Sequence, residues 1–118
     1  MAFALDSIGE AKRSVSFATA VVPLTQAVQD VARYGRRDFD RPARDDRSGM
    51  LPPKVAQMMI NLTGPDRQKN LLDPFCGSGT IMQEALLLGY NQVIGADASA
   101  KAISDSKQNL AWLKKNFK

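Results

Sequence analysis

A glycine turn at residues 74–79 is the feature that most constrains the fold of this 118-residue chain. Residues 70–73, before the turn, are typical of a short buried strand, and residues 80–88, after it, have the apolar spacing of a helix that Gly89 ends. In this order, a turn lies over the carboxyl end of the strand and against the first turn of the helix. The segment therefore predicts a strand–helix unit of a parallel sheet, with a ligand site at the turn.

Flanking residues extend this unit. Residues 92–97 are expected to form a second strand, and Ser99 is the expected N-cap of a last helix. Upstream, Pro52-Pro53 opens a helix that Gly64-Pro65 ends. The first helix has an apolar stripe formed by Val55, Met58, Met59 and Leu62. The expected inner face of the last helix consists of Ile103, Ser106, Leu110 and Leu113. We predict an α/β fold with a parallel βαβ core, preceding helices and an incomplete sheet.

Two acids bracket the glycine turn and indicate the kind of ligand. A dinucleotide fingerprint needs a further glycine where Met82 stands, and a P-loop needs a lysine that the turn lacks. Asp73 ends the first strand, where it would repel phosphate and suits a cationic group, such as the amino group and sulfonium of S-adenosylmethionine. Asp97 ends the second strand and can accept hydrogen bonds from both hydroxyls of a ribose. Alternatively, the two carboxylates only cap the turns that follow them.

The turn carries a family resemblance. Its sequence, Asp-Pro-Phe-Cys-Gly-Ser-Gly-Thr at residues 73–80, resembles class I S-adenosylmethionine-dependent methyltransferases, most closely the RNA guanine methyltransferases that usually carry a THUMP domain. The resemblance covers about residues 27–113 and implies a Rossmann-like fold and the exocyclic amine of a tRNA guanosine as substrate. It further implies that the cofactor contacts Asp73, Pro74, Cys76, Gly77, Ser78, Gly79 and Thr80, with Asp97 at the ribose and Ala98 beside the adenine.

The catalytic Asp-Pro-Pro-Tyr motif of that family is absent from this sequence. We therefore expect residues 49–118 to be the cofactor-binding half of a methyltransferase domain, a fragment without catalytic residues that is inactive alone. Its expected partners are tRNA and the missing C-terminal half of the enzyme. The alternatives are a non-catalytic nucleic-acid-binding or scaffold remnant of the fold, and a fragment of a DNA or ribosomal RNA methyltransferase.

Residues 1–48 are expected to form a lead-in segment and a polar linker. Residues 14–21 alternate like a strand, and Thr25 is the expected cap of a short helix that ends at Gly35. The loop expected at residues 36–46 contains three arginines that are candidates for contacts with RNA phosphates. They are Arg37, Arg41 and Arg44. Neighbouring aspartates nearly balance their charge, so a solvated, salt-bridged loop is the alternative.

Composition narrows the chemistry further. A net charge of +4 permits an acidic partner such as RNA without requiring one. The chain has no histidine and one cysteine, Cys76, which excludes histidine acid–base chemistry and argues against a metal site. We expect Cys76 to pack in the turn, and Trp112 and Phe117 to pack rather than stack on bases. Glu84 either orients the turn or is exposed.

With no secretory signal or membrane-length apolar run, we expect a cytoplasmic protein without a membrane partner.

Overall fold

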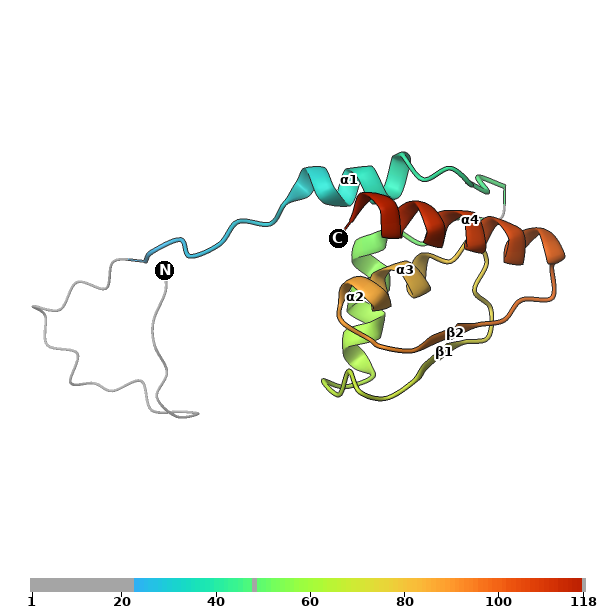
Figure 1. Cartoon of the computed structure of the whole chain (residues 1–118). Helices are drawn as coiled ribbons and strands as arrows, with labels where there is room; N and C mark the ends of the chain where they lie inside the picture. The colour runs from blue at the N-terminus through green and yellow to red at the C-terminus, as the bar shows by residue number, and fades with distance from the viewer. Residues whose placement is uncertain (1–22, 48, 118) are drawn as a thin grey trace, which may run out of the picture.

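The computed structural model describes residues 23–47 and 49–117 of the chain (Figure 1). These residues form four helices and a two-stranded parallel sheet, which confirms the predicted α/β class and element order. The predicted strand at residues 14–21 lies outside the described ranges. The elements are α1 (Val31–Phe39), α2 (Pro53–Leu62), β1 (Leu71–Asp73), α3 (Thr80–Leu87), β2 (Val93–Gly95) and α4 (Ala100–Asn116).

Helix α3 is the central element. It packs on both strands and also contacts α2 and α4, so that the helices gather on one side of the sheet (Figure 1). In the sheet, Leu71 pairs with Val93 and Leu72 with Ile94. Because side chains alternate along a strand, Leu71 points into the core and Leu72 points away from it. The core joins Leu71 to Ile60, Ala85 and Tyr90.

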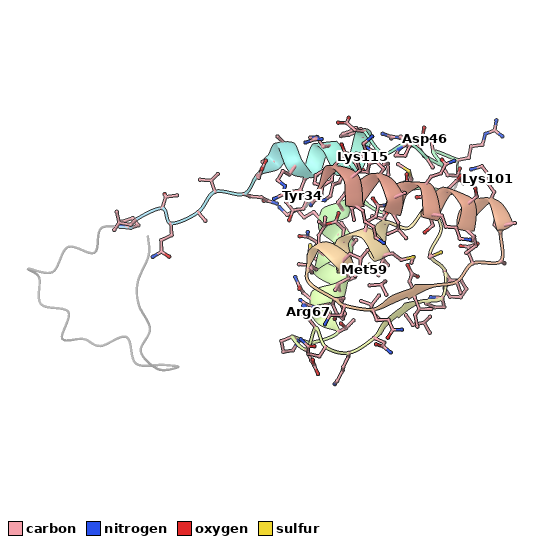
Figure 2. The ribbon with its side chains drawn as sticks, in the orientation of Figure 1. Tyr34, Asp46, Met59, Arg67, Lys101 and Lys115 are labelled. Atoms are coloured by element: carbon pink, nitrogen blue, oxygen red, sulfur yellow. The ribbon has the colours of Figure 1, made fainter. Side chains whose placement is uncertain are left out.

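Helix α2 buries a different face from the predicted one. The stripe expected to be buried is exposed, at 39% for Val55, 61% for Met58, 47% for Met59 and 88% for Leu62. Pro53, Ala56 and Ile60 are buried in its place. The apolar spacing identified the helix correctly, but it did not identify the face that meets α3, where fully buried Ala56 allows close approach. Met59 is labelled in Figure 2.

Helix α1 begins later and ends later than predicted. Its N-cap is Asp30, whose side chain accepts a hydrogen bond from the Arg33 N–H, and not Thr25. The helix continues past Gly35 to Phe39, so the first part of the expected loop is helical. Tertiary contacts hold this last part, because Arg37 is anchored on α3 and Tyr34 donates to Gln57 on α2 (Figure 2 labels Tyr34).

Helix α4 packs on α3, and Phe117, which follows α4, meets α1. Ser99 caps α4 as predicted by accepting from the Ala102 N–H. At its other end, the buried Phe117 ring lies edge-on to Trp112, and its centroid is 5.1 Å from the Arg36 guanidinium carbon. The predicted packing role of Phe117 is confirmed. Of the predicted inner face, Ser106 and Leu113 are buried, whereas Ile103 and Leu110 are only half-buried. None of the helices in the described ranges is long and apolar enough to cross a membrane.

Candidate functional site

The tips of β1 and β2 lie side by side, as the sequence predicted. Beyond the strands, the Ala96 N–H donates to the Asp73 carbonyl at 2.9 Å and the Cys76 N–H donates to the Ala96 carbonyl at 2.9 Å. The Gly77 N–H then donates to Asp97 Oδ2 at 2.9 Å. These bonds fasten the glycine turn to the end of β2, and both acids therefore flank the same turn.

The Asp73 carboxylate is buried but retains capacity for a ligand. Its side chain is 7% exposed, and Oδ1 accepts a hydrogen bond from the Phe75 N–H at 3.1 Å. Within the described part of the chain, Oδ2 accepts no hydrogen bond. Asp73 thus caps its turn, as the alternative interpretation expected, while one oxygen remains available to a cationic group.

Asp97 accepts two backbone hydrogen bonds. Its Oδ1 accepts from the Ser99 N–H at 2.8 Å, and its Oδ2 accepts from Gly77. These two bonds, first that from Ser99 and then that from Gly77, lower the pKa of Asp97 below its ordinary value. The side chain is therefore ionised at neutral pH. Each carboxylate oxygen has a second lone pair, so Asp97 can accept further hydrogen bonds.

A pocket of about 150 Å³ opens beside the turn. Asp73 lines it together with Cys76, Gly77, Ser78 and Thr80, and residues 49–51 form another wall. This volume is below the roughly 300 Å³ at which typical small-molecule pockets begin. The pocket therefore suits one end of a larger ligand.

Four of the predicted cofactor residues lie outside this pocket. Gly79 is buried against α4, where a Cβ would stand 2.5 Å from Ser106 Oγ, and its φ of +87° also favours glycine. Pro74 borders another hollow, on the α2 side of β1. Ala98 is exposed. Asp97 contacts the turn by accepting a hydrogen bond from the Gly77 N–H. The structure thus brings Asp73 and most of the turn into one pocket, with Asp97 and Ala98 beyond it.

Cys76 packs within the turn. It is 6% exposed, and its Cβ lies beneath Gly95, where a side chain on Gly95 would meet it at 3.1 Å. Burial raises the pKa of the thiol, and the negative charges of Asp73 and Asp97 raise it further. A protonated thiol is a poor nucleophile. The expectation that Cys76 packs and does not attack a base agrees with both observations.

Arg37 lies inside the protein and not on an RNA-facing surface. Its side chain is 5% exposed and binds Glu84 with two hydrogen bonds, Nε to Oε1 at 2.6 Å and Nη2 to Oε2 at 3.2 Å. Gln57 Nε2 also donates to Glu84 Oε2 at 2.6 Å. Glu84 is 1% exposed, so it is neither an exposed acid nor a ligand of the turn backbone. It instead ties α1 and α2 to α3.

Arg41 is also buried, directly behind the turn. Its Nη1 donates to Thr80 Oγ1 at 2.6 Å, and Asp38 Oδ1 lies 3.8 Å from Nη2. Burial lowers the pKa of Arg41, and the charge of Asp38 partly opposes this effect. An arginine nonetheless stays protonated in proteins. Of the three predicted phosphate ligands, only Arg44 is partly exposed, at 32%, and it binds Asp46 and two backbone carbonyls in a salt-bridged loop.

Asn109 on α4 is the site residue whose role the sequence did not reveal. It is fully buried, and its Nδ2 donates to the carbonyls of Ala43 at 2.8 Å and Ser78 at 2.9 Å. Its Oδ1 accepts from the Ala43 N–H at 3.0 Å. Asn109 therefore fastens both the segment around Ala43 and the glycine turn to α4. The available signal was a polar residue three positions after Ser106, on the inner face of the helix.

A family model for the RMKL-like methyltransferase domain matches residues 41–116, which is more than half of the chain. The chain belongs to this methyltransferase family. The match confirms the resemblance drawn from the glycine turn, and membership implies a methyl donor as cosubstrate. The matched range begins at Arg41, so this methyltransferase part includes the end of the segment that we predicted to be a linker.

Curated relatives of this methyltransferase domain include tRNA-modifying enzymes. The chain is 39% identical over 79 residues to the tRNA (guanine(10)-N2)-dimethyltransferase of Methanothermobacter thermautotrophicus, covering 67% of this chain and 21% of that protein. It is 37% identical over 83 residues to the enzyme of the same name from Pyrococcus abyssi, and the match covers 70% of this chain and 22% of that protein. In a shorter match, the chain is 40% identical over 58 residues to the ribosomal protein L11 methyltransferase of Pseudomonas fluorescens, which covers 48% of this chain and 20% of that protein. The chain thus spans about a fifth of the length of these relatives.

Proposed function

We propose that the described residues form the donor-binding part of an S-adenosylmethionine-dependent methyltransferase with a Rossmann-like sheet. One observation carries the proposal. Asp73, with a free carboxylate oxygen, and the ionised Asp97 flank a glycine turn that opens into a pocket. The donor is a cation that bears an amino acid at one end and a nucleoside at the other. Asp73 suits the amino acid end and Asp97 suits the nucleoside end, and the glycine backbone between them has no side chain to block the donor.

In this arrangement, Asp73 accepts hydrogen bonds from the ammonium group of the donor. Gly77 has no side chain, so the methionine arm approaches the backbone of the turn. Asp97, beyond the pocket, accepts the ribose hydroxyls, and the exposed Ala98 lies beside the adenine. When bound, the donor supplies an electrophilic methyl group on its sulfonium. The residues of this chain bind and orient the donor.

We further propose that the methyl acceptor is RNA, specifically the exocyclic amine of a guanosine in tRNA, and that the protein acts in the cytoplasm. The two longer matches, to enzymes named for tRNA guanine methylation, support this substrate. The shorter match, to a ribosomal protein methyltransferase, indicates that the donor half of the site does not by itself select the acceptor. The sequence contains no Asp-Pro-Pro-Tyr motif, so we assign no catalytic residue within it.

The proposed partner on the outer face of the sheet is the remaining part of such a methyltransferase domain. Leu72 is 62% exposed and its register partner Ile94 is 46% exposed, on the face that no described helix covers. Parallel sheets are normally buried on both faces. The relatives are about five times longer than the matched segment, which provides the chain length for such a cover.

Isothermal titration calorimetry with S-adenosylmethionine tests the donor site. We expect binding by the wild type and at least about 10-fold weaker binding by Asp73→Asn and by Asp97→Asn, since each loses a charge-assisted hydrogen bond. Asp66→Asn, which changes an exposed turn-capping acid before β1, is the matched control. No heat with the wild type, or equal affinity for all four proteins, contradicts the proposal.

Two further measurements separate the alternatives. The chain alone should transfer no methyl group to unmodified tRNA, because it lacks the catalytic motif; transfer would show that catalytic groups are present here. A nucleic-acid-binding or scaffold module without donor chemistry would instead bind tRNA in a mobility shift and give no heat with S-adenosylmethionine.

A further inference from the structure

Positive charge gathers around one aromatic ring where the end of α4 meets α1. Three arginines of α1 have their guanidinium carbons 5.1–5.9 Å from the centroid of the Phe117 ring. They are Arg33, Arg36 and Arg37. Phe117 directly follows the last turn of α4, which contains Lys114 and Lys115. Five cations therefore share one region of the molecule, although like charges repel one another.

Only one of these five cations is paired closely with a carboxylate. Arg37 is buried and lies 2.6 Å from Glu84. Arg36 Nε lies 4.0 Å from Asp40, and both side chains of this pair are more than half exposed. Exposed ion pairs of this kind contribute little. The other three cations form no ion pair within the described part of the chain; they are Arg33, Lys114 and Lys115.

The exposed cations of this region outnumber its acids. We define the basic patch as the four exposed cations, Arg33, Arg36, Lys114 and Lys115. The exposed acids beside it are Asp40 and Asp30, which caps α1. Four cations against two acids leave two positive charges, half of the net charge of +4 of the whole chain. A surface with this excess attracts a polyanion.

The Phe117 ring holds the two arginines of the basic patch. A guanidinium that stacks on an aromatic face keeps its N–H groups free at its edge. Within the described residues, the side chains of Arg33 and Arg36 donate no hydrogen bond. Each presents five N–H donors in a planar fork that matches the oxygens of a phosphate. The basic patch therefore contains phosphate ligands that the fold has already positioned, beside two more flexible lysines.

We propose that the basic patch binds the phosphate backbone of the RNA that accepts the methyl group. The inference rests on the proposed function and deepens it, because it assigns a surface to the acceptor. It takes the place of the surface expected from the sequence, where Arg37 and Arg41 are buried and Arg44 is paired with Asp46.

Helix α1 connects the basic patch to the pocket beside the glycine turn. The patch arginines lie in the first two turns of α1, and Arg41, which follows the helix, donates to Thr80 at the pocket. A helix of nine residues is about 14 Å long. Phosphates held on the patch thus belong to nucleotides close to the base that receives the methyl group.

Fluorescence anisotropy of labelled, unmodified tRNA with the whole 118-residue chain, over a series of salt concentrations, tests the basic patch. The logarithm of the association constant should fall linearly with the logarithm of the salt concentration, because phosphate contacts release counterions. Arg33→Gln/Arg36→Gln should weaken binding by about 5-fold or more at low salt and lower this slope by about 1.4–1.8.

Two single variants form a matched pair, since each removes one charge from an exposed lysine. Lys115→Gln should lower the slope by about 0.7–0.9. Lys69→Gln, in the turn between α2 and β1, should leave the slope unchanged; the Lys69 side chain is 78% exposed. Figure 2 shows Arg67 of this turn on the opposite side of the structure from Lys115.

Folding and donor binding are measured on the same variants. Circular dichroism shows whether loss of the two arginines loosens α1. Lys115→Gln removes no contact among the described residues, so it tests the patch even if the double variant does not fold. In calorimetry with S-adenosylmethionine, both should bind like the wild type, because the patch lies outside the pocket. Absence of donor binding by the wild type would contradict the donor site and not the patch.

Three results would overturn the basic patch. The first is absence of tRNA binding by the wild type, or an unchanged salt slope in both patch variants. The second is an equal loss in Lys69→Gln and Lys115→Gln, because binding would then follow total charge and not location. The third comes from competition: poly-uridylate should displace tRNA more effectively than poly-glutamate of equal charge, and the reverse order would assign the surface to an acidic protein.

Discussion

The two faces of the β1–β2 sheet differ sharply. On the face covered by α3, Leu71 packs in a core with Ile60 and Ala85, and the buried Glu84 carboxylate is paired with Arg37. On the opposite face, Leu72 and Ile94 are exposed. The difference teaches that the described helices cover one face of the sheet and leave the other open, with the pocket that we propose for the donor beside the glycine turn at the strand tips. Stability should therefore depend on one face alone.

The Arg37–Glu84 pair gives the largest expected effect on the covered face. Arg37→Met leaves the Glu84 carboxylate buried with Gln57 as its one remaining donor, which should lower the free energy of unfolding by about 3–5 kcal/mol. Urea unfolding followed by circular dichroism measures the change. Arg36→Met, the exposed control, should stay within about 0.5 kcal/mol. The double variant Arg37→Met/Glu84→Met should recover most of the loss, because it removes the unpaired charge. A single variant as stable as the control would show that the pair does not hold α1 on α3.

A pair of truncations tests the contrast between the faces directly. Ile60→Ala removes a side chain that is 2% exposed and should cost about 2–5 kcal/mol, because it leaves a cavity in the core. Leu72→Ala acts on the bare face and should change stability by less than about 0.5 kcal/mol. The same urea titration compares them. Similar losses in the two variants would mean that the outer face is covered in solution, for instance by a second molecule, and sedimentation of the wild type would then show a dimer.

The sequence predicted the parts of this fold that depend on local rules. The order of strands and helices, the Ser99 cap and the position of the two acids at the strand tips follow from short-range patterns, and all are observed. It did not predict the pairing of Arg37 with Glu84, 47 positions apart, or of Ala43 with Asn109, 66 positions apart. Such contacts depend on how helices meet in space. For the same reason, the buried arginines were assigned to a surface.

The glycine turn itself offers a smaller and more local contrast. Gly77 and Gly79 both have positive φ, at +50° and +87°, and alanine at either should cost about 1–2 kcal/mol for the left-handed backbone. Only Gly79 has a neighbour in the way, since its Cβ would stand 2.5 Å from Ser106 Oγ. Gly79→Ala should therefore destabilise more than Gly77→Ala by thermal unfolding. Adding Ser106→Ala should return part of that excess; no recovery would mean that backbone conformation alone accounts for it.

Asp97, at the edge between the two faces, gives the smallest effect on stability, and its sign depends on pH. Hydrogen bonds from Ser99 and Gly77 lower the pKa of Asp97 in the folded state, so its contribution to stability is present above the ordinary aspartate pKa of about 3.9 and is lost as pH falls through the lower, folded value. Asp97→Asn should therefore be less stable than the wild type at pH 7, and the difference should shrink as the pH is lowered below about 4 in urea titrations. Asp66→Asn, at an exposed turn that also caps a backbone N–H, is the matched comparison. A difference independent of pH would mean that the turn recognises the shape of this side chain and not its charge, and the electrostatic basis for a ribose-binding carboxylate would then be lost.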